Sequence, residues 1–382
     1  MLIGVPAETM TGETRVAVTP ETAKKLVAQG HRVLVQAGAG IAASATDEAY
    51  RAVGAEIVDA AGAFGAALVL KVRAPVAEEL ALMQPGAAVV GMLEPFDAAG
   101  LQRLAAAGVT GFALEAAPRT TRAQSLDVLS SQANIAGYKA VLLAANRYGR
   151  LFPMLMTAAG TIKAARVVVL GVGVAGLQAI ATAKRLGAVI EASDVRPSVK
   201  EQVESLGAKF IDVPYETAEE KEAAEGVGGY ARPMPQSWLE RQQVEVAKRV
   251  AQADIVISTA LIPGRAAPVL ISEDMVRSMK PGSVIVDLAA GKGPQGPHGG
   301  PGGNCPLTEA GQTVTRHGVH LIGETNLPAL APADSSALYA RNVLDFLKLV
   351  CPKDAAALAI PVDDDIVAAC LVTRDGAVLR QS

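Results

Sequence analysis

Short apolar runs alternate along the chain with stretches whose apolar residues recur at helical spacing. Near the N-terminus, the runs Leu2–Val5 and Arg32–Gln36 flank the helical stretch Pro20–Ala28. Three more apolar runs and one helical stretch follow before residue 115: Ala67–Val72, Ala88–Met92, Thr110–Ala113 and Asp97–Ala107. Strands that alternate with helices in this order predict a parallel sheet covered by helices on both faces.

The same alternation resumes after a polar segment, Arg119–Gln132, and a long helical run, Asn134–Tyr148. The later region is expected to contain helices at Ser198–Leu206, Trp238–Ala251, Ser272–Ser278 and Ser335–Leu349, with strands at Lys209–Val213, Ile255–Ser258, Ser283–Leu288 and Gly318–Ile322. Between them, Gly291–Gly303 has too few side chains to form a core element.

These patterns predict an α/β protein with two Rossmann-like, doubly wound parallel-sheet domains, the second inserted into the first. The first domain is expected to combine residues 1–133 with 325–382, and the second to span 134–324, with a connecting helix over 134–148. The last stretch, Asp365–Thr373, is expected to return to the first domain.

A dinucleotide-binding fingerprint occupies the segment from Arg166 to Asp194. A β-branched strand leads into Gly171, Gly173 and Gly176, and an alanine-rich helical run follows. The first glycine allows a tight turn, the second lets the backbone approach a pyrophosphate, and the third lets the helix pack on the sheet. Val174, between the second and third glycines, is a further candidate cofactor contact at the helix start, where unpaired N–H groups favour phosphate.

The acid that completes the fingerprint is Asp194. It comes 23 residues after Gly171, close to the expected spacing of about 20, where a carboxylate accepts hydrogen bonds from the adenosine ribose. A 2′-phosphate would meet this carboxylate as a like charge, so NAD(H) is favoured over NADP(H) as the cofactor. Arg196 is close enough in sequence to weaken this discrimination without removing the acid.

Composition excludes several other classes of protein. A net charge of −3 and the lack of a basic stripe argue against a nucleic-acid partner. The three cysteines are widely spaced and form no metal-ligand pattern, so no metal site is expected. The longest uncharged run, Val167–Ala183, contains the fingerprint glycines and fits a buried strand and helix better than a membrane span, so the chain is expected to be soluble.

Polar residues outside the fingerprint gather mainly in one segment. Arg119, Gln124, Asp127 and Ser130 have side chains suited to a carboxamide or a phosphate, although composition alone favours a solvated loop that caps the next helix. Lys71, at the end of an apolar strand, is expected to point outward. Tyr230 lies in a glycine-rich stretch that could close over a cofactor or form a surface excursion.

Four segments carry a family resemblance: GVPAET…ETRVAVTP, RAQSLDVLSSQANIAGYKAV, VVVLGVGVAGLQAIATAKRLGA and VIVDLAA…GGNCPLT. Together they closely resemble the NAD(H)-binding component of proton-translocating transhydrogenases, over nearly the whole chain. The RAQSLDVLSSQ segment discriminates within the wider superfamily, which includes alanine dehydrogenase.

The resemblance implies that Arg119, Gln124, Asp127 and Ser130 line the nicotinamide site, with the first three as catalytic candidates. It implies that the Tyr230 loop closes over NAD(H), and that the fingerprint glycines and Asp194 contact the cofactor. It further implies a homodimer that docks on an NADP(H)-binding component beside a membrane component that conducts protons. The chain would then lie on the cytoplasmic face of the inner membrane, held there by these partners.

An alanine-dehydrogenase-like oxidoreductase is the main alternative. Arg15 and Lys71 fit the pattern of that enzyme, but Gly91–Pro95 lacks its histidine and Gly291 replaces its acid. Oxidation of an amine releases a proton and calls for an acid or base, whereas hydride exchange between two nicotinamides releases none. The sequence therefore favours transhydrogenation. A catalytically silent NAD(H)-binding subunit is a third possibility, and the long Gly291–Gly303 segment is expected to form a floppy surface loop.

Overall fold

The computed structural model describes residues 1–225, 234–354 and 356–380. It divides into two compact units, one formed by Met1–Gln132 with Pro328–Ser382 and the other by Ala133–Leu327. Unit 2 is thus inserted into the sequence of unit 1. Tyr230, the candidate residue of the glycine-rich stretch, lies outside the described residues.

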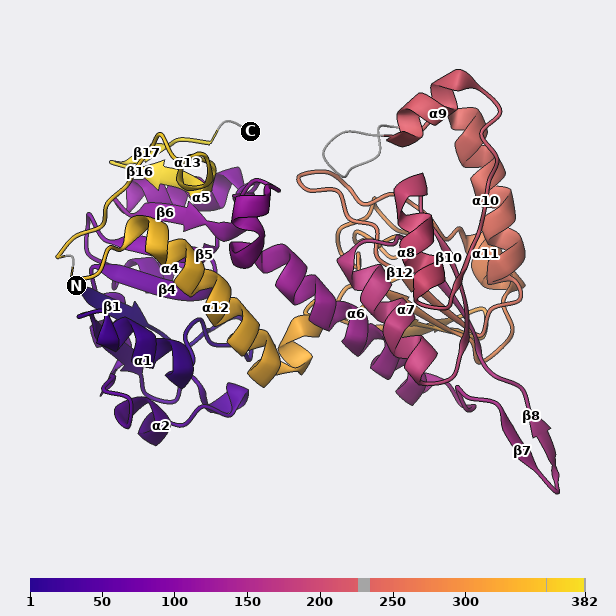
Figure 1. Cartoon of the computed structure of the whole chain (residues 1–382), viewed down its shortest axis with the longest axis horizontal. Coiled ribbons are helices and arrows are strands. Elements are labelled where there is room, and N and C mark those ends of the chain that lie inside the picture. Colours follow the sequence, from indigo (N-terminus) through magenta and orange to yellow (C-terminus); the bar gives the residue numbers. More distant parts are fainter. Residues whose placement is uncertain (226–233, 355, 381–382) are drawn as a thin grey trace. The chain divides into compact units, whose positions relative to one another are not determined.

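Unit 1 contains an eight-stranded sheet whose strands follow the order β17-β16-β6-β5-β4-β1-β2-β3 (Figure 1). The strands are β1 (Leu2–Val5), β2 (Arg32–Gln36), β3 (Glu56–Val58), β4 (Leu68–Arg73), β5 (Ala88–Met92), β6 (Thr110–Ala113), β16 (Leu371–Arg374) and β17 (Ala377–Val378). β1 to β6 are parallel. The chain returns to this sheet near its C-terminal end and adds β16, antiparallel to β6, and then β17, antiparallel to β16, at the edge.

Helices cover both faces of this sheet: α1 (Pro20–Ala28), α2 (Asp47–Arg51), α3 (Ala60–Phe64), α4 (Ala77–Leu80), α5 (Ala98–Ala106), α12 (Pro332–Val350) and α13 (Asp365–Cys370). In β4, Leu68 and Leu70 join a core with α1 and α12, whereas Val69 packs into the opposite core with α3 and α5. Successive side chains of β4 point to opposite faces of the sheet, and each face is covered by a hydrophobic core. Every side chain of the strand interior is therefore buried, as expected for a parallel sheet.

Unit 2 contains a seven-stranded sheet of order β11-β10-β9-β12-β13-β15-β14, parallel except for β14 at one edge. The strands are β9 (Arg166–Leu170), β10 (Val189–Ser193), β11 (Lys209–Phe210), β12 (Ile255–Ser258), β13 (Val284–Asp287), β14 (Thr313–Arg316) and β15 (Val319–Ile322). Its helices are α7 (Val174–Arg185), α8 (Lys200–Ser205), α9 (Ala218–Glu225), α10 (Gln236–Val250) and α11 (Glu273–Ser278).

The α/β prediction of two largely parallel sheets is confirmed. The connecting helix, however, is longer than the predicted 134–148 span, because α6 runs from Val128 to Arg147. Asp127 accepts the backbone N–H of Ser130 and so satisfies a donor at the helix start. Segment 119–132 was predicted as a loop because of its polar side chains, yet some of these side chains are the ones that begin the helix.

The glycine-rich Gly291–Gly303 segment also differs from the prediction of a floppy loop. Its backbone folds back on itself, with the N–H groups of Gly291 and Gly293 both donating to the carbonyl of Gly302. A bridge between Gln295 and Pro301 continues the pairing. Backbone hydrogen bonds therefore organise a segment that has few side chains to pack.

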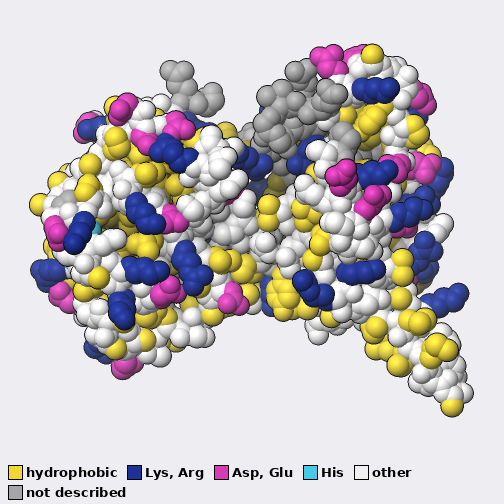
Figure 2. Space-filling view, viewed as in Figure 1, with side chains coloured by type: hydrophobic (Ala, Val, Ile, Leu, Met, Phe, Trp, Pro, Cys, Tyr) yellow, Lys and Arg dark blue, Asp and Glu magenta, His cyan; other side chains and the backbone are white. Residues whose placement is uncertain are grey.

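A short antiparallel hairpin of unit 2, β7 (Leu155–Thr157) and β8 (Gly160–Ile162), was not predicted from the sequence. Its side chains are exposed even where they are apolar, and Met156 is 71% accessible. Figure 2 shows hydrophobic side chains gathered on this hairpin. Among the described residues, no helix is both long enough and apolar enough to cross a membrane.

Close packing of α6 on α7 predicts that Gly137→Ala destabilises unit 2. A Cβ at Gly137 would lie 2.1 Å from the carbonyl oxygen of Ala175, so one helix must move. We expect the free energy of unfolding to fall by about 1–3 kcal/mol. Gly149→Ala is the matched control, since a Cβ there meets nothing within 4 Å. Urea unfolding of both variants measures the difference, and equal stabilities would contradict the prediction.

Candidate functional site

The fingerprint loop of unit 2 forms a turn between β9 and α7 in which each glycine has a separate role. Gly171 has a φ of +90°, a backbone conformation that favours glycine, and its N–H donates to the carbonyl of Ser193 on β10. Gly173 precedes the first turn of α7. A Cβ on Gly176 would lie 2.1 Å from the carbonyl oxygen of Gly171, so only glycine lets the helix approach the turn.

This geometry fits a dinucleotide. The N–H groups at the start of the 12-residue helix α7, which begins at Val174, have no partners within the helix, and a pyrophosphate can accept from them. No side chain intervenes at Gly173, where a Cβ would meet nothing within 4 Å. The backbone of the loop can therefore come close to a phosphate.

Asp194 lies directly after β10 and next to the fingerprint loop. Its Oδ2 accepts the N–H of Val172 at 2.7 Å, and its carboxylate forms an ion pair with Arg196. The acid thus lies beside the glycine turn, as the fingerprint predicts.

A second buried carboxylate, Asp287 at the end of β13, organises the neighbouring loops. Oδ1 accepts from the backbone of Ala289 and Asn304, and Oδ2 accepts from the N–H of Cys305 and the hydroxyl of Thr308. Burial raises the pKa of Asp287, and these four donors oppose that effect by stabilising the ionised form.

Asn304, which Asp287 positions, extends this order to the loop after β12. Its side-chain amide donates to the carbonyls of Ala260 and Pro268 and accepts from the N–H of Ala260. Thr259, which precedes Ala260 in the same loop, donates its hydroxyl to the carbonyl of Gly171. Asp287 therefore positions Asn304, and Asn304 in turn stabilises the loop that contacts the fingerprint turn. We did not predict this role, because Asn304 is 44 residues from Ala260 in the sequence and a VIVD motif does not specify such partners.

The polar candidates of unit 1 have two different environments. Asp127 and Ser130 lie together, with the Ser130 hydroxyl donating to Oδ2 of Asp127 at 2.5 Å. Gln124 is exposed, within the 3₁₀ helix Thr121–Leu126, and Arg119 is exposed just before it. Asp127 and Ser130 cap α6, so the capping interpretation accounts for two of the four polar candidates. The Gln124 side chain takes no part in this cap and is accessible.

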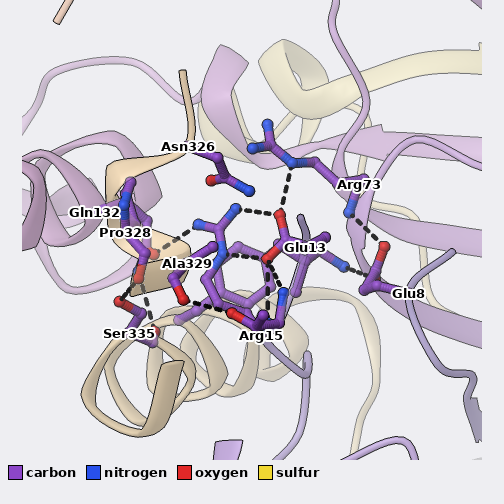
Figure 3. A network of polar contacts seen from close by, with 12 residues as sticks. Glu8, Glu13, Arg15, Arg73, Gln132, Asn326, Pro328, Ala329 and Ser335 are labelled. Carbon is purple, nitrogen blue, oxygen red and sulfur yellow. Dashed lines mark hydrogen bonds and ion pairs between the residues drawn. The ribbon is translucent and has the colours of Figure 1, made fainter. Parts of the chain in front are cut away.

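Unit 1 also contains a largely buried network of charged side chains, part of which is drawn in Figure 3. Arg15, only 2% exposed, donates to both carboxylate oxygens of Glu13 and to the side-chain oxygen of Gln132. Arg73 donates to the same Glu13 carboxylate at 2.9 Å.

The prediction that Lys71 points outward is wrong. Its side chain is 1% exposed and forms ion pairs with Glu79 at 3.0 Å and Glu8 at 3.2 Å. Lys71 lies on the same face of β4 as Val69, the face covered by α3 and α5, with its ammonium 5.5 Å from the centre of the Phe64 ring. Both carboxylates come from other segments, which is why the local pattern around Lys71 did not indicate burial.

Comparison with known proteins identifies the family. The family model for the alanine dehydrogenase/PNT N-terminal domain matches residues 4–136 of this sequence. The family model for the C-terminal domain matches residues 140–381. The chain belongs to the alanine dehydrogenase/PNT family.

Within this family the chain is more similar to transhydrogenase subunits than to alanine dehydrogenases. It is 49% identical to an NAD(P) transhydrogenase alpha-subunit polypeptide of Rhodospirillum rubrum, over 100% of this chain and 98% of that one. It is 31% identical to the alanine dehydrogenase of Bacillus subtilis over 100% of this chain and 93% of the relative. The crystal structure of the transhydrogenase from Sinorhizobium meliloti superimposes with a TM-score of 0.87 at 44% identity, covering 99% of this chain and 100% of that chain.

Asp287→Asn is expected to destabilise unit 2 by about 2–4 kcal/mol, because an amide NH₂ would face donors that now bind a carboxylate oxygen. Asp212→Asn is the matched control: it removes an exposed ion pair with Lys200, which contributes at most about 1 kcal/mol. Thermal unfolding monitored by calorimetry compares the two. If the two variants unfolded at the same temperature, Asp287 would not have the organising role described here.

Proposed function

We propose that this chain is the NAD(H)-binding subunit of a proton-translocating transhydrogenase, which transfers hydride between NADH and NADP⁺ held by a partner component. The main support is the 49% identity to a transhydrogenase alpha-subunit polypeptide over the full chain. The dinucleotide-binding geometry of unit 2 supports the NAD(H)-binding part of this function independently of that similarity.

In this proposal, unit 2 binds the ADP half of NAD(H). The backbone of Gly171, Gly173 and Val174 approaches the pyrophosphate, and Gly176 allows α7 to present its N–H groups. Asp194 accepts hydrogen bonds from the adenosine ribose.

The nicotinamide half is assigned to the polar segment of unit 1. Gln124 and Arg119 have exposed side chains that can contact the nicotinamide, and Asp127 can accept from its carboxamide while it continues to cap α6. Ser130, which donates to Asp127, positions that carboxylate. Tyr230, outside the described residues, is proposed to close over the bound cofactor by analogy with the family.

The bound nicotinamide supplies the hydride, and the protein's role is to hold the ring in place and exclude water. No proton has to be moved by a side chain in this exchange. Two observations fit such a hydride exchange better than they fit the oxidation of alanine. No histidine occurs in Gly91–Pro95, and both Arg15 and Lys71, the residues that fit the alanine dehydrogenase pattern, are buried and ion-paired to carboxylates.

The partners follow from the same family analogy. We propose a homodimer that docks on an NADP(H)-binding component at the cytoplasmic face of the inner membrane, with proton movement confined to a separate membrane component. The exposed apolar hairpin β7–β8 supports self-association, since an exposed apolar patch often marks a protein contact.

Hydride transfer from NADH to a spectrally distinct NADP⁺ analogue tests the function directly. We expect rapid transfer only when a purified NADP(H)-binding transhydrogenase component is added. A parallel assay supplies pyruvate and ammonium in place of that component. Oxidation of NADH in the parallel assay alone would contradict the proposal and favour the alanine-dehydrogenase-like alternative. Binding of NADH with no transfer in either assay would favour a silent binding subunit.

Gln124→Asn is expected to reduce the rate of hydride transfer at least tenfold while it changes NADH affinity little, because it shortens a side chain that positions the nicotinamide without touching the ADP site. The matched control is Gln102→Asn, another exposed glutamine of unit 1. Stopped-flow transfer rates and NADH titrations separate the two effects. A large loss of NADH affinity in Gln124→Asn would show that the role is misassigned.

If the homodimer forms through the exposed hairpin β7–β8, charges placed on the hairpin should weaken it. Introducing charge at two exposed positions, Leu155→Glu with Met156→Glu, is expected to weaken the homodimer about 100-fold or more, because charges would enter an apolar contact. Met10→Glu changes an exposed methionine of unit 1 and is the control. Sedimentation velocity across a range of concentrations reports the mass. A hairpin variant that stays dimeric at the dilution limit would exclude β7–β8 from the interface.

A further inference from the structure

The Asp194 carboxylate has no free acceptor site. Oδ1 accepts from the backbone N–H and from Nε of Arg196, each at 2.9 Å. Oδ2 accepts from the N–H of Val172 at 2.7 Å and from Nη2 of Arg196 at 3.0 Å. Because a carboxylate offers about four lone-pair sites, these four donors fill it. A ribose hydroxyl can therefore bind Asp194 only by displacing one of them.

The four donors are not equally easy to displace. Two are backbone N–H groups fixed by the fingerprint turn and by the bend after β10. The other two belong to the Arg196 side chain, which is 23% exposed and covers a carboxylate that is itself 7% exposed. The guanidinium can rotate toward solvent without any change in the backbone, so it is the exchangeable partner.

We propose that Arg196 occupies the ribose-binding position on Asp194 until a nucleotide arrives, and that this competition limits the preference for NAD(H). The inference rests on the proposed function, namely that unit 2 binds NAD(H). A ribose hydroxyl is a hydrogen-bond donor, so it can replace a guanidinium N–H on the carboxylate. A 2′-phosphate, largely ionised at neutral pH, offers acceptors and cannot make this replacement.

The pairing also changes the electrostatic basis of selectivity. Asp194 and Arg196 together are close to neutral, so a 2′-phosphate does not meet an isolated negative charge. It meets a guanidinium, which binds phosphate well. Arg196 therefore competes with the ribose of NAD(H) and attracts the 2′-phosphate of NADP(H), and the selectivity that remains comes from donor exchange on Asp194.

Removal of Arg196 should shift the two affinities in opposite directions. Arg196→Met keeps the length of the side chain and removes its donors and charge. ADP-ribose is expected to bind about tenfold more tightly, because no ion pair has to be broken. The 2′-phosphorylated ADP-ribose is expected to bind about tenfold more weakly, because it now faces an unneutralised Asp194. Loss of a merely structural contact would weaken both ligands together.

Isothermal titration calorimetry of the full chain with these two ligands measures both affinities. Arg277→Met is the matched control, since it removes the exposed ion pair of Arg277 with Glu273 on α11 in the same unit. Arg196→Lys keeps the charge and loses the two-point geometry, so it should show the same opposite shifts at smaller size. If thermal unfolding shows that Arg196→Met does not fold, Arg196→Lys takes its place in the test.

The outcomes separate the two levels of inference. Weaker or unchanged binding of ADP-ribose to Arg196→Met, with normal binding to the wild type, would overturn the role of Arg196 and leave the proposed function standing. Failure of the wild-type chain to bind ADP-ribose at all would overturn the proposed function itself, and the role of Arg196 with it.

Discussion

Buried carboxylates surrounded by donors determine how the loops of this protein are held. Asp194 and Asp287 each accept four hydrogen bonds at the carboxyl ends of parallel strands in unit 2, and Glu13 accepts from two arginines in unit 1. Because an ionised group buried without partners is very unfavourable, each carboxylate requires its donors to stay in position. In such sheets ligands bind at the carboxyl ends of the strands, and these contacts order the loops at that edge.

The same constraint limits the chemistry that unit 1 can perform. A site that binds an oxo acid or amino acid needs a cation with an open face for the substrate carboxylate. The Arg15 guanidinium is held by Glu13 and Gln132, and the Lys71 ammonium by Glu8 and Glu79. Release of either cation would take a positively charged donor away from a buried carboxylate. Charges that a related enzyme could use for a substrate therefore stabilise the fold here, which agrees with an exchange of hydride that requires no acid or base.

Features set by local sequence could be predicted, and features set by distant partners could not. The central strands of the two large sheets and the fingerprint turn depend on periodicity and on glycines a few residues apart, and the structure contains them where expected. The burial of Lys71 depends on Glu8, 63 positions earlier in the chain. The early start of α6 was missed because a polar segment is compatible with either a loop or a capped helix, and only the contact of Asp127 with Ser130 distinguishes them.

A dinucleotide fingerprint specifies an acid but not the donors that surround it, and the geometry of Asp194 shows why those donors matter. The motif fixes the position of the carboxylate, but the residue two places later fixes its hydrogen-bonding state. A paired acid distinguishes ligands by whether they can donate, whereas an unpaired acid distinguishes them by charge. Two chains with the same glycines and the same aspartate can therefore select nucleotides by different physical means, and the side chain that covers the aspartate decides which one operates.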